Sequence, residues 1–328
     1  MFLLSIKIKI MKKIFITGGA GFIGSHIAEF FFNKYKNTKI IILDKITYAG
    51  NLFFLNEIIK SKRVKFIKSD IINYKKYEND LKNVDLALNV AAESHVDRSF
   101  KNSILFTKTN TLGAHIFIQK CMEQKVKKII HVSTDEVYGE IIKGSANEDS
   151  YFNPTNPYSA SKAASEMILN SYRFYEKKKI TIIRGNNIYG IRQYPEKLIP
   201  TCIINILKNK KIEINGDGSH VRCFLSVQDF AEAIFLLVKK KKTGIFNIGN
   251  SKHYKNLDIA IMICSFLNKN HKKNIRFVTD RPFNDKRYSI NFNKIKKLGW
   301  KPKRDLIDDL PKIIQWYKKN IKLFRKKI

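Results

Sequence analysis

Short apolar runs separated by longer amphipathic stretches recur through the first half of the chain. The runs at 13–17, 40–43, 64–67, 84–89, 128–132 and 180–184 have the length and the aliphatic content of strands. A helical spacing of apolar residues follows the first run, at 27–32. Strands that alternate with helices predict an α/β fold built on a doubly wound parallel sheet, whose ligands lie beyond the carboxyl ends of its strands.

The alternation weakens after the strand at 180–184, where loop residues become frequent: Pro195, Pro200, Gly216, Gly218 and Pro282. We therefore expect a main domain at 12–187, with segments at about 222–250 returning to its sheet. A smaller substrate-binding lobe is expected to occupy most of 188–328. Residues 1–11 are expected to be an extension, because Met11 stands directly before the first strand, with residues 1–10 either an upstream start or a frayed extension.

The first strand leads into a glycine-rich turn, Gly18-Gly-Ala-Gly21-Phe22-Ile23-Gly24, and then into the helix. This order is typical of the βαβ unit that binds dinucleotides, because the glycines let the backbone approach a pyrophosphate at the helix N-terminus. The second strand ends in Asp44, where an acid accepts a hydrogen bond from the adenosine ribose and repels a 2′-phosphate. The pattern predicts a Rossmann domain that prefers NAD to NADP, with an ordinary structural turn as the alternative.

A second group of residues indicates proton-transfer chemistry. Tyr158 and Lys162 are four residues apart, which places them one turn apart on one face of a helix. An ammonium near a tyrosine favours the phenolate, so this pair can supply a base for a hydroxyl proton. Asp135 and Glu136 add two carboxylates, one of which can act as acid and the other as base if their surroundings separate their pKa values. Base, acid and hydride acceptor together suggest a dehydration driven by transient oxidation.

Charge and cysteine content narrow the class of protein. The formal net charge is +34, but most basic residues are lysines spread along the chain, whereas nucleic-acid readers concentrate arginine and aromatic residues on one face. We interpret the charge as a solvated lysine surface and expect no specific nucleic-acid partner. No apolar run reaches the ~18–20 residues that span a bilayer, so no membrane association is expected. The cysteines and histidines are scattered, which predicts free thiols, a cytoplasmic location and no metal.

With these motifs placed, the chain resembles the extended short-chain dehydrogenases/reductases, and among them the nucleotide-sugar 4,6-dehydratases. The resemblance runs from about Lys12 to about Tyr317. The segments that carry it are 43–51, 91–99, 131–139, 195–200, 216–218 with Arg222, and 280–288. The adjacent Thr134, Asp135 and Glu136 are its most selective part, because epimerases and decarboxylases of this fold usually lack the two carboxylates.

The resemblance implies a set of site residues. Those implied to act in catalysis are Thr134, Asp135, Glu136, Tyr158 and Lys162. Those implied to bind NAD are Gly18, Gly21, Phe22, Ile23, Gly24, Asp44, Lys45, Thr47, Asp70, Ile71, Ala91, Ala92, Ser94 and Thr109, together with Tyr158 and Lys162. Those implied to bind substrate are Ser94, Thr134, Asn187, Glu196, Lys197, Leu198, Arg222, Asn256, Asp280, Arg281, Asn284 and Tyr288. Ordinary turn, cap and surface roles are the alternatives for the residues outside the catalytic group.

The reaction implied by the resemblance has zero net redox change. Tyr158 removes the 4-hydroxyl proton of a nucleotide-linked glucose as C4 gives hydride to NAD, Glu136 takes the C5 proton, and Asp135 protonates the departing 6-hydroxyl. Hydride then returns to C6 and gives the 4-keto-6-deoxy sugar. The helix of Tyr158 continues with an apolar stripe at Met167, Ile168 and Tyr172, and the family pairs this helix across a two-fold axis, so a homodimer is expected.

The sequence leaves the nucleotide base open. Phe283-Asn284 and Cys223-Phe224 stand where bacterial thymidine-nucleotide enzymes usually carry Gly-His and Asp-Trp, and the segment at 184–190 looks more like the UDP-glucose enzymes. The segments around Tyr48 and Ser94 look like the thymidine enzymes, and we favour dTDP-glucose over UDP-glucose. A 4-epimerase or decarboxylase, and a non-catalytic nucleotide-sugar sensor, remain as alternatives on the same fold.

Overall fold

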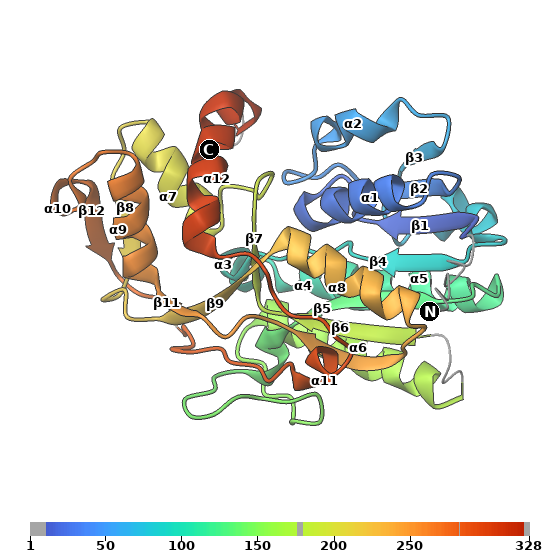
Figure 1. Ribbon diagram of the computed structural model, residues 1–328. Coiled ribbons are helices and arrows are strands. Elements are labelled where there is room, and N and C mark those ends of the chain that lie inside the picture. Colours follow the sequence, from blue (N-terminus) through green and yellow to red (C-terminus); the bar gives the residue numbers. More distant parts are fainter. Residues whose placement is uncertain (1–10, 176–179, 282, 325–328) are drawn as a thin grey trace, which may run out of the picture.

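The main sheet is seven-stranded and wholly parallel. The computed structural model describes residues 11–175, 180–281 and 283–324. The strands lie in the order β10-β6-β5-β4-β1-β2-β3, with every neighbouring pair parallel (Figure 1). Their bounds are β1 Lys13–Thr17, β2 Lys39–Asp44, β3 Val64–Lys68, β4 Leu86–Asn89, β5 Ile129–Thr134, β6 Ile180–Gly185 and β10 Gly244–Ile248. The doubly wound α/β fold expected from the apolar runs is confirmed.

Helices cover both faces of this sheet because its strands are apolar on both faces. Ile14 and Ile16 of β1 pack on the side of α1 and α8, whereas Phe15 packs on the side of α5 and α6. The longer helices are α1 Phe22–Lys34, α5 Ala114–Glu123, α6 Pro157–Tyr175, α7 Leu198–Leu207, α8 Val227–Lys239, α9 Asn256–Phe266 and α12 Leu306–Asn320. The shorter ones are α2 Asn56–Ile59, α3 Val96–Lys101, α4 Ser103–Phe106, α10 His271–Asn274 and α11 Asn293–Lys296.

Several single turns of 3-10 helix and one π-helical segment complete the set. The 3-10 turns are η1 Leu52–Leu55, η2 Tyr74–Lys76, η3 Glu78–Leu81, η5 Asp135–Tyr138 and η6 Ile321–Phe324. The π-helical segment η4, Thr107–Gly113, lies between α4 and α5. Such segments are often found at functional sites. No helix in the described ranges is both long and apolar enough to cross a membrane.

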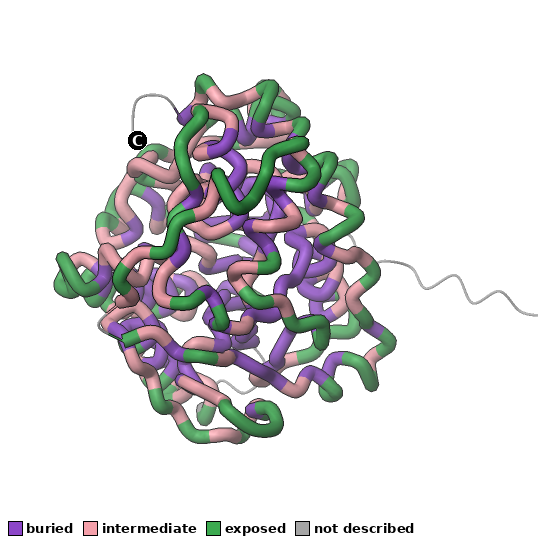
Figure 2. The backbone as a smooth tube through the Cα atoms, turned by 90° about the vertical axis from the view of Figure 1, so that its left-hand side faces the viewer, coloured by how far each residue is buried: buried purple, intermediate pink, exposed green. Residues whose placement is uncertain are grey.

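A second group of elements lies beside the carboxyl ends of the main strands. It holds a three-stranded sheet, β11-β9-β7, and a parallel pair, β12-β8. Their bounds are β7 Asn187–Tyr189, β8 Ile212–Asn215, β9 Val221–Ser226, β11 His253–Lys255 and β12 Ile275–Val278. Helices α7, α9 and α12 share an apolar core with these strands. Figure 2 views the molecule from this side, where exposed segments surround a buried interior.

The sequence prediction that the segment at 222–250 returns to the main sheet is wrong for its first strand. β10 pairs with β6 at the edge of the main sheet, as expected. β9, however, pairs with β7 and β11 in the smaller sheet. Cys223, Phe224 and Leu225 are buried in the smaller sheet. A strand of such apolar residues would also suit the main sheet, so its own sequence does not specify its neighbour.

Candidate active site

A cavity of about 570 Å³ opens at the carboxyl ends of the parallel strands, facing the second group of elements. The main sheet contributes residues that follow its strands, including Gly18 after β1, Asp44 at the end of β2 and Thr134 at the end of β5. Residues of β9 and α9, among them Arg222 and Asn256, line the opposite wall. This is the position expected for a ligand site in a doubly wound sheet.

The glycine-rich turn brings the backbone to the cavity wall. Gly18 has a φ of +67°, and a Cβ there would lie 2.7 Å from the backbone of Ala91. A Cβ on Gly24 would lie 2.1 Å from the carbonyl oxygen of Gly18, so the turn can close against α1 only with glycine there. Gly21 is the N-cap of α1, and within the described chain no side chain caps this helix, so its first N–H groups remain available to an anion.

Asp44 is fixed by the backbone on both sides. Its Oδ2 accepts a hydrogen bond from the N–H of Ala20 at 2.9 Å, and its Oδ1 accepts one from the N–H of Ile46 at 2.7 Å. Burial raises the pKa of this carboxyl, and the backbone donors oppose that shift. Lys45 pairs with Asp70 at 2.7 Å beside it. A ribose hydroxyl could still donate to the free lone pairs of Asp44.

The other residues implied to bind the cofactor share this cavity. Gly18, Gly21, Phe22, Ile23, Asp44, Lys45, Thr47, Asp70, Ile71, Ala91, Ala92, Ser94, Thr109, Tyr158 and Lys162 all line it. Gly24 does not; it lies in the first turn of α1, where it permits the close packing described above. Ser133, also on the wall, has a buried hydroxyl that finds no hydrogen-bond partner among the described residues. The glycine cradle, the acid after β2 and this free hydroxyl fit a bound dinucleotide.

Tyr158 and Lys162 lie on α6, where Lys162 is buried and Tyr158 is partly exposed on the cavity wall, and Thr134 ends the neighbouring strand β5. The Thr134 hydroxyl accepts a hydrogen bond from the N–H of Glu136 at 3.2 Å, which starts the turn η5. The Lys162 ammonium donates to the carbonyl oxygen of Val132 at 2.6 Å. Burial lowers the pKa of Lys162 to about 8, and the carboxylate of Glu166 opposes that shift.

The phenolate expected for Tyr158 is not favoured in this structure. Burial raises the pKa of Tyr158, the Glu136 carboxylate raises it further, and a hydrogen bond from Thr134 acts in the opposite direction. The ammonium of Lys162 is directed at the carbonyl of Val132. A phenolate was expected from the nearby positive charge alone, whereas desolvation is the largest influence on the pKa of Tyr158.

The two adjacent carboxyl groups have different surroundings. Asp135 is 2% exposed, and its Oδ2 accepts a hydrogen bond from Nδ2 of Asn186 at 2.7 Å. Burial raises the pKa of Asp135 to about 7, the charge of Glu136 adds to the rise, and the bond from Asn186 opposes it. Glu136 lies on the cavity wall and accepts a hydrogen bond from Asn156 at 3.4 Å. Burial raises the pKa of Glu136, and the charges of Lys197 and Arg222 oppose the rise.

These surroundings separate the two groups in the way that acid and base catalysis requires. Asp135 can keep a proton near neutral pH, since its pKa is raised to about 7 by burial in the protein interior. Glu136 faces the cavity and lies close to two cationic side chains, which favour its ionised form. Asp135 itself is not on the cavity wall, but Thr134, Glu136 and Asn186 on either side of it are.

Most residues implied to bind substrate lie on the opposite wall. The cavity is lined by Ser94, Thr134, Asn187, Glu196, Lys197, Leu198, Arg222, Asn256, Arg281, Asn284 and Tyr288. Lys197 donates to the carbonyl oxygen of Ser94 at 2.5 Å, and Tyr48 donates to Glu196 at 2.9 Å. These two bonds join the start of α7 to the loops of the main sheet.

Arg222 and Arg281 reach the wall with different partners. Arg222 stacks on the ring of Tyr288 at 4.4 Å and donates to Oδ1 of Asn284 at 3.3 Å. Arg281 pairs with Asp97 of α3, with Nε 2.6 Å from Oδ1. Asp280 is not on the wall; it accepts a hydrogen bond from Asn284 at 2.8 Å. Its place is therefore behind a residue that faces the cavity.

Several buried amides and a histidine support the catalytic groups, and the sequence motifs did not point to the amides. Asn110 in η4 donates to the carbonyl of Glu93 and to the hydroxyl of Ser161, each at 2.9 Å. His131 has Nδ1 3.1 Å from Nδ2 of Asn89 and Nε2 3.5 Å from Nζ of Lys162. Asn156 and Asn186, described above, bind the two carboxyl groups.

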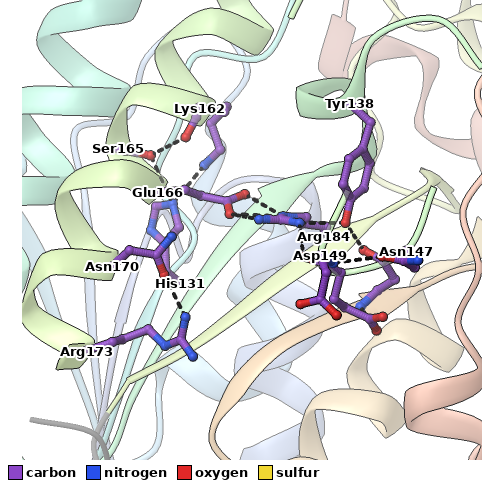
Figure 3. Close-up of polar contacts among 12 residues, drawn as sticks. His131, Tyr138, Asn147, Asp149, Lys162, Ser165, Glu166, Asn170, Arg173 and Arg184 are labelled. Carbon is purple, nitrogen blue, oxygen red and sulfur yellow. Dashed lines mark hydrogen bonds and ion pairs between the residues drawn. The ribbon is translucent and has the colours of Figure 1, made fainter. Parts of the chain in front are cut away.

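Behind α6 a buried ion pair fastens the helix to the sheet (Figure 3). Arg184 of β6 contacts Glu166 of α6 through two nitrogens, with Nη2 2.7 Å and Nε 2.9 Å from Oε2. Nη1 of Arg184 donates to the hydroxyl of Tyr138 at 2.6 Å, and Tyr138 donates to Asn247 of β10 at 2.8 Å. The helix of Tyr158, the strand β6 and the turn η5 are thus joined through one guanidinium group.

Comparisons with known proteins show the family to which the chain belongs. A family model described as GDP-mannose 4,6-dehydratase matches residues 15–311. The chain belongs to this family. The chain is thus an extended short-chain dehydrogenase/reductase of the nucleotide-sugar 4,6-dehydratase type. In the described residues, no group of three or more His, Cys, Asp or Glu is arranged to hold a metal ion.

Individual members of the family resemble the chain over most of its length. It is 41% identical to a dTDP-D-glucose 4,6-dehydratase of Dictyostelium discoideum, over 94% of this chain and 82% of that protein. It is 43% identical to a trifunctional UDP-glucose 4,6-dehydratase, epimerase and reductase of Arabidopsis thaliana, over 94% of this chain but only 47% of that longer protein. The structure superposes with a TM-score of 0.91 and 35% identity on the dTDP-glucose 4,6-dehydratase DesIV of Streptomyces venezuelae, solved with NAD and TYD bound, covering 95% and 98% of the two chains.

Proposed function

We propose that this protein is an NAD-dependent lyase that removes water from a nucleotide-diphosphate glucose and gives the 4-keto-6-deoxy sugar. The observation that carries the proposal is the pair of carboxyl groups of Asp135 and Glu136 beside Tyr158. One is buried and holds its proton to a pKa of about 7 because burial disfavours its charge, and the other faces the cavity. A 4-epimerase needs Tyr158 and the cofactor, but it has no step for this acid and base.

Each catalytic residue then has one task. The phenolate oxygen of Tyr158 takes the proton of the sugar 4-hydroxyl, and Thr134 orients the Tyr158 side chain. Glu136 removes the C5 proton, which the 4-ketone makes acidic, and Asp135 protonates the 6-hydroxyl as the C6–O bond breaks and water leaves. Glu136 afterwards returns a proton to C5. Bound NAD would supply the hydride acceptor for C4 and the hydride donor for C6.

Lys162 serves this scheme by its charge and its place. The first step requires an ionised Tyr158, although burial and the Glu136 charge raise its pKa, and the Lys162 ammonium one turn along α6 is the cationic group proposed to offset them. Burial lowers the pKa of Lys162 to about 8, so the group is still mostly protonated at neutral pH. Its bond to the carbonyl of Val132 fixes the side chain under the cavity. The remaining cavity residues named above are proposed to bind NAD on the side of Asp44 and the sugar diphosphate on the side of Arg222.

The preference for NAD is proposed to rest on Asp44. Replacement of Asp44 by Ala should weaken the binding of NAD. It should also reduce the difference in affinity between NAD and NADP, because the 2′-phosphate would no longer meet a carboxylate. Isothermal titration of the unmodified protein and of Asp44→Ala with both dinucleotides tests this. Equal affinities of the unmodified protein for NAD and NADP would contradict the role of Asp44.

dTDP-glucose is proposed as the first substrate to test, and UDP-glucose as the second. Both are supported by relatives of similar identity: the Dictyostelium protein is named for the thymidine nucleotide and the Arabidopsis protein for the uridine nucleotide. DesIV, which is named for dTDP-glucose, has the high structural similarity reported above. The two substrates differ in the nucleoside, thymine on deoxyribose against uracil on ribose, and share the glucose on which the proposed catalytic residues act.

A homodimer and a cytoplasmic location complete the proposal. Exposed apolar side chains gather where α6 packs against α3, α4 and η4: Phe100, Ile104, Leu112, Met167 and Phe174. We call these five residues the helical patch. Burial of such a patch against a second copy is favourable. The cysteines at 121, 202, 223 and 264 are free and buried, as suits a reducing compartment. The division into 12–187, with a returning segment, and 188–328 is also kept as a proposal.

The experiment is an assay of the purified protein with NAD and either dTDP-glucose or UDP-glucose. Formation of the 4-keto-6-deoxy sugar is followed by its absorbance in alkali and by mass spectrometry, which registers the loss of water. In deuterium oxide, deuterium should enter at C5, because Glu136 exchanges its proton with solvent before returning it. A product that keeps its mass but changes configuration at C4 would assign the protein to the epimerases. Binding without turnover would assign it to the sensors.

A further inference from the structure

The amide of Asn186 is held in one orientation by a backbone N–H group, which cannot change its hydrogen-bonding role. Asn186 is 4% exposed and follows β6. Its Oδ1 accepts a hydrogen bond from the backbone N–H of Asn250 at 2.9 Å. A backbone N–H can only donate, so the atom facing Asn250 must be the amide oxygen, and the NH₂ group must point the other way.

The NH₂ group of Asn186 points at Asp135. Nδ2 lies 2.7 Å from Oδ2 of Asp135 and donates to it. Oδ2 is therefore an acceptor in every protonation state of this carboxyl group. When Asp135 carries its proton, Oδ1 is the better place for it, because a carbonyl oxygen accepts the bond from Asn186 more strongly than a carboxyl hydroxyl oxygen does. Oδ1 accepts a hydrogen bond from the Thr134 hydroxyl at 3.4 Å, but a hydroxyl, unlike the amide, can turn to accept instead, and Thr134 lines the cavity.

We propose that Asn186 is a positioning residue for Asp135: it keeps Oδ2 as the acceptor and so makes Oδ1 the oxygen that carries the proton and delivers it to the leaving 6-hydroxyl. This inference rests on the function proposed above. As the C6–O bond breaks, the proton passes from Oδ1 to the departing oxygen and water is released. The resulting carboxylate keeps its hydrogen bond from Asn186, which stabilises the charge that develops in this step.

Gly249 leaves the space that the Asn186 amide occupies. A Cβ at Gly249 would lie 2.1 Å from Oδ1 of Asn186 and 3.0 Å from its Cγ. Glycine therefore allows the Asn186 amide to reach the N–H of Asn250. Replacement of Gly249 by Ala should push the Asn186 amide aside without changing any group that touches Asp135. It therefore tests whether the position of this amide matters when the amide itself is still present.

Several titratable groups surround Asp135 and bear on its protonation. They are Glu136 on η5, Tyr158 on α6, and Arg222 and Cys223 on β9. None of them is altered in Asn186→Ala or Gly249→Ala. Because the hydrogen bond from Asn186 opposes the rise of the Asp135 pKa, its loss should raise that pKa further. The pH at which product formation falls on the alkaline side should then move upward.

The test compares Asn186→Ala and Gly249→Ala with the unmodified protein, using dTDP-glucose or UDP-glucose, whichever the unmodified protein converts. Reduced cofactor absorbance reports oxidation at C4, and release of the keto-deoxy sugar reports elimination. In both variants product release should slow by at least about tenfold, though by less than the ~10²–10⁴-fold cost of losing a positioned acid altogether. Reduced cofactor should still form at a rate near normal and should accumulate. In Asn186→Ala the alkaline limb of the pH profile, which is the pH range where product formation falls as pH rises, should also lie at higher pH.

Asn247→Ala is the matched control. Asn247 is a fully buried amide of the same region, and it binds Tyr138 and two carbonyl groups but not Asp135. It should lower thermal stability about as much as Asn186→Ala without accumulation of reduced cofactor and without movement of the alkaline limb.

The inference is overturned if Asn186→Ala releases product at the normal rate, or if it slows C4 oxidation and elimination in equal proportion, since both results indicate a merely structural amide. Absence of both signals in the unmodified protein, with either substrate, refutes the proposed function and this inference together.

Discussion

At the scale of the residue, the site is organised by what each carboxyl group is allowed to do with a proton. Asp135 and Glu136 are consecutive in the chain, yet one is enclosed and the other faces the cavity. An asparagine supports each of them: Asn186 binds Asp135 and Asn156 binds Glu136. Neutral donors of this kind orient a carboxyl group without adding a charge that would fix its protonation state.

Removal of both carboxyl groups should separate oxidation from elimination. In the double variant Asp135→Asn, Glu136→Gln the shape of the site is nearly unchanged, and Tyr158 is intact. Product formation should fall by about 10²–10⁴-fold or more, because that range is the usual cost of losing one positioned acid or base. Reduced cofactor should still appear when substrate is added, as measured by absorbance in a stopped-flow experiment.

The matched variant for this experiment is Tyr158→Phe, which should abolish both signals, since the 4-hydroxyl proton then has no acceptor. A double carboxyl variant that makes the keto-deoxy sugar at near-normal rate would contradict the roles assigned to the pair.

The pH dependence of the unmodified enzyme should reveal the proton on Asp135. Elimination needs this carboxyl protonated, and burial raises its pKa to about 7, so product formation should decline as pH rises above that value. The same shift has a consequence for stability: between the ordinary value of 3.8 and about 7 the folded state binds the proton more tightly than the unfolded state. The contribution of Asp135 to the free energy of unfolding should therefore fall as pH rises through this window.

Urea unfolding at several pH values measures this contribution when the unmodified protein is compared with Asp135→Asn, which cannot titrate. The free energy of unfolding of the unmodified protein should fall relative to that of Asp135→Asn as pH rises. A difference that is independent of pH between 4 and 7 would show that Asp135 keeps its ordinary pKa of 3.8, contrary to the raised value.

At the scale of the element, α6 depends on a charge pair that no solvent reaches. The side chains of Arg184 and Glu166 are 2% and 0% exposed. Replacement of Glu166 by Gln or of Arg184 by Met leaves the other charge buried and unpaired, which should lower the free energy of unfolding by about 3–5 kcal/mol. The measurement is denaturant unfolding followed by fluorescence.

The double variant Glu166→Leu, Arg184→Met provides the control, because an apolar pair of similar volume removes both charges at once. It should recover much of the lost stability. Single variants within about 0.5 kcal/mol of the unmodified protein, the usual range for surface substitutions, would contradict a desolvated pair.

The sequence predicts elements well where their character is local, and less well where partners are distant. The apolar runs predicted the main strands to within a few residues, and the spacing of Tyr158 and Lys162 predicted their shared helix. β9 was assigned to the wrong sheet, because an apolar strand does not specify its neighbour. Asn186 could not be assigned to Asp135 because 51 residues separate them, and the orientation of its amide is set by Asn250, a further 64 residues along the chain.

At the scale of the whole molecule, the helical patch predicts how two copies associate. Ile104 is 75% exposed and Met167 is 67% exposed, on helices that pack against each other. Ile104→Asp combined with Met167→Asp should convert a dimer into a monomer, since burial of the patch would then require two carboxylates to lose their water. Light scattering coupled to size exclusion at micromolar concentration measures the mass.

Phe277→Asp is the control for this experiment. Phe277 is also exposed and apolar, but it lies on β12, at the far end of the second group of elements from α6 (Figure 1). This variant should remain dimeric. An unmodified protein that is monomeric at micromolar concentration would refute the homodimer.

The edge position of β10 has a consequence for biosynthesis. β6 is complete once Gly185 has been made, but its outer neighbour begins only at Gly244. Until then the growing chain presents Ile180, Ile182 and Ile183 on an open edge strand, which is a typical nucleus for aggregation. A translation product that stops before Gly244 would keep that edge and would also lack the N–H of Asn250. Late emergence of this strand from the ribosome therefore makes the nascent chain a natural client for chaperones that cover hydrophobic edges.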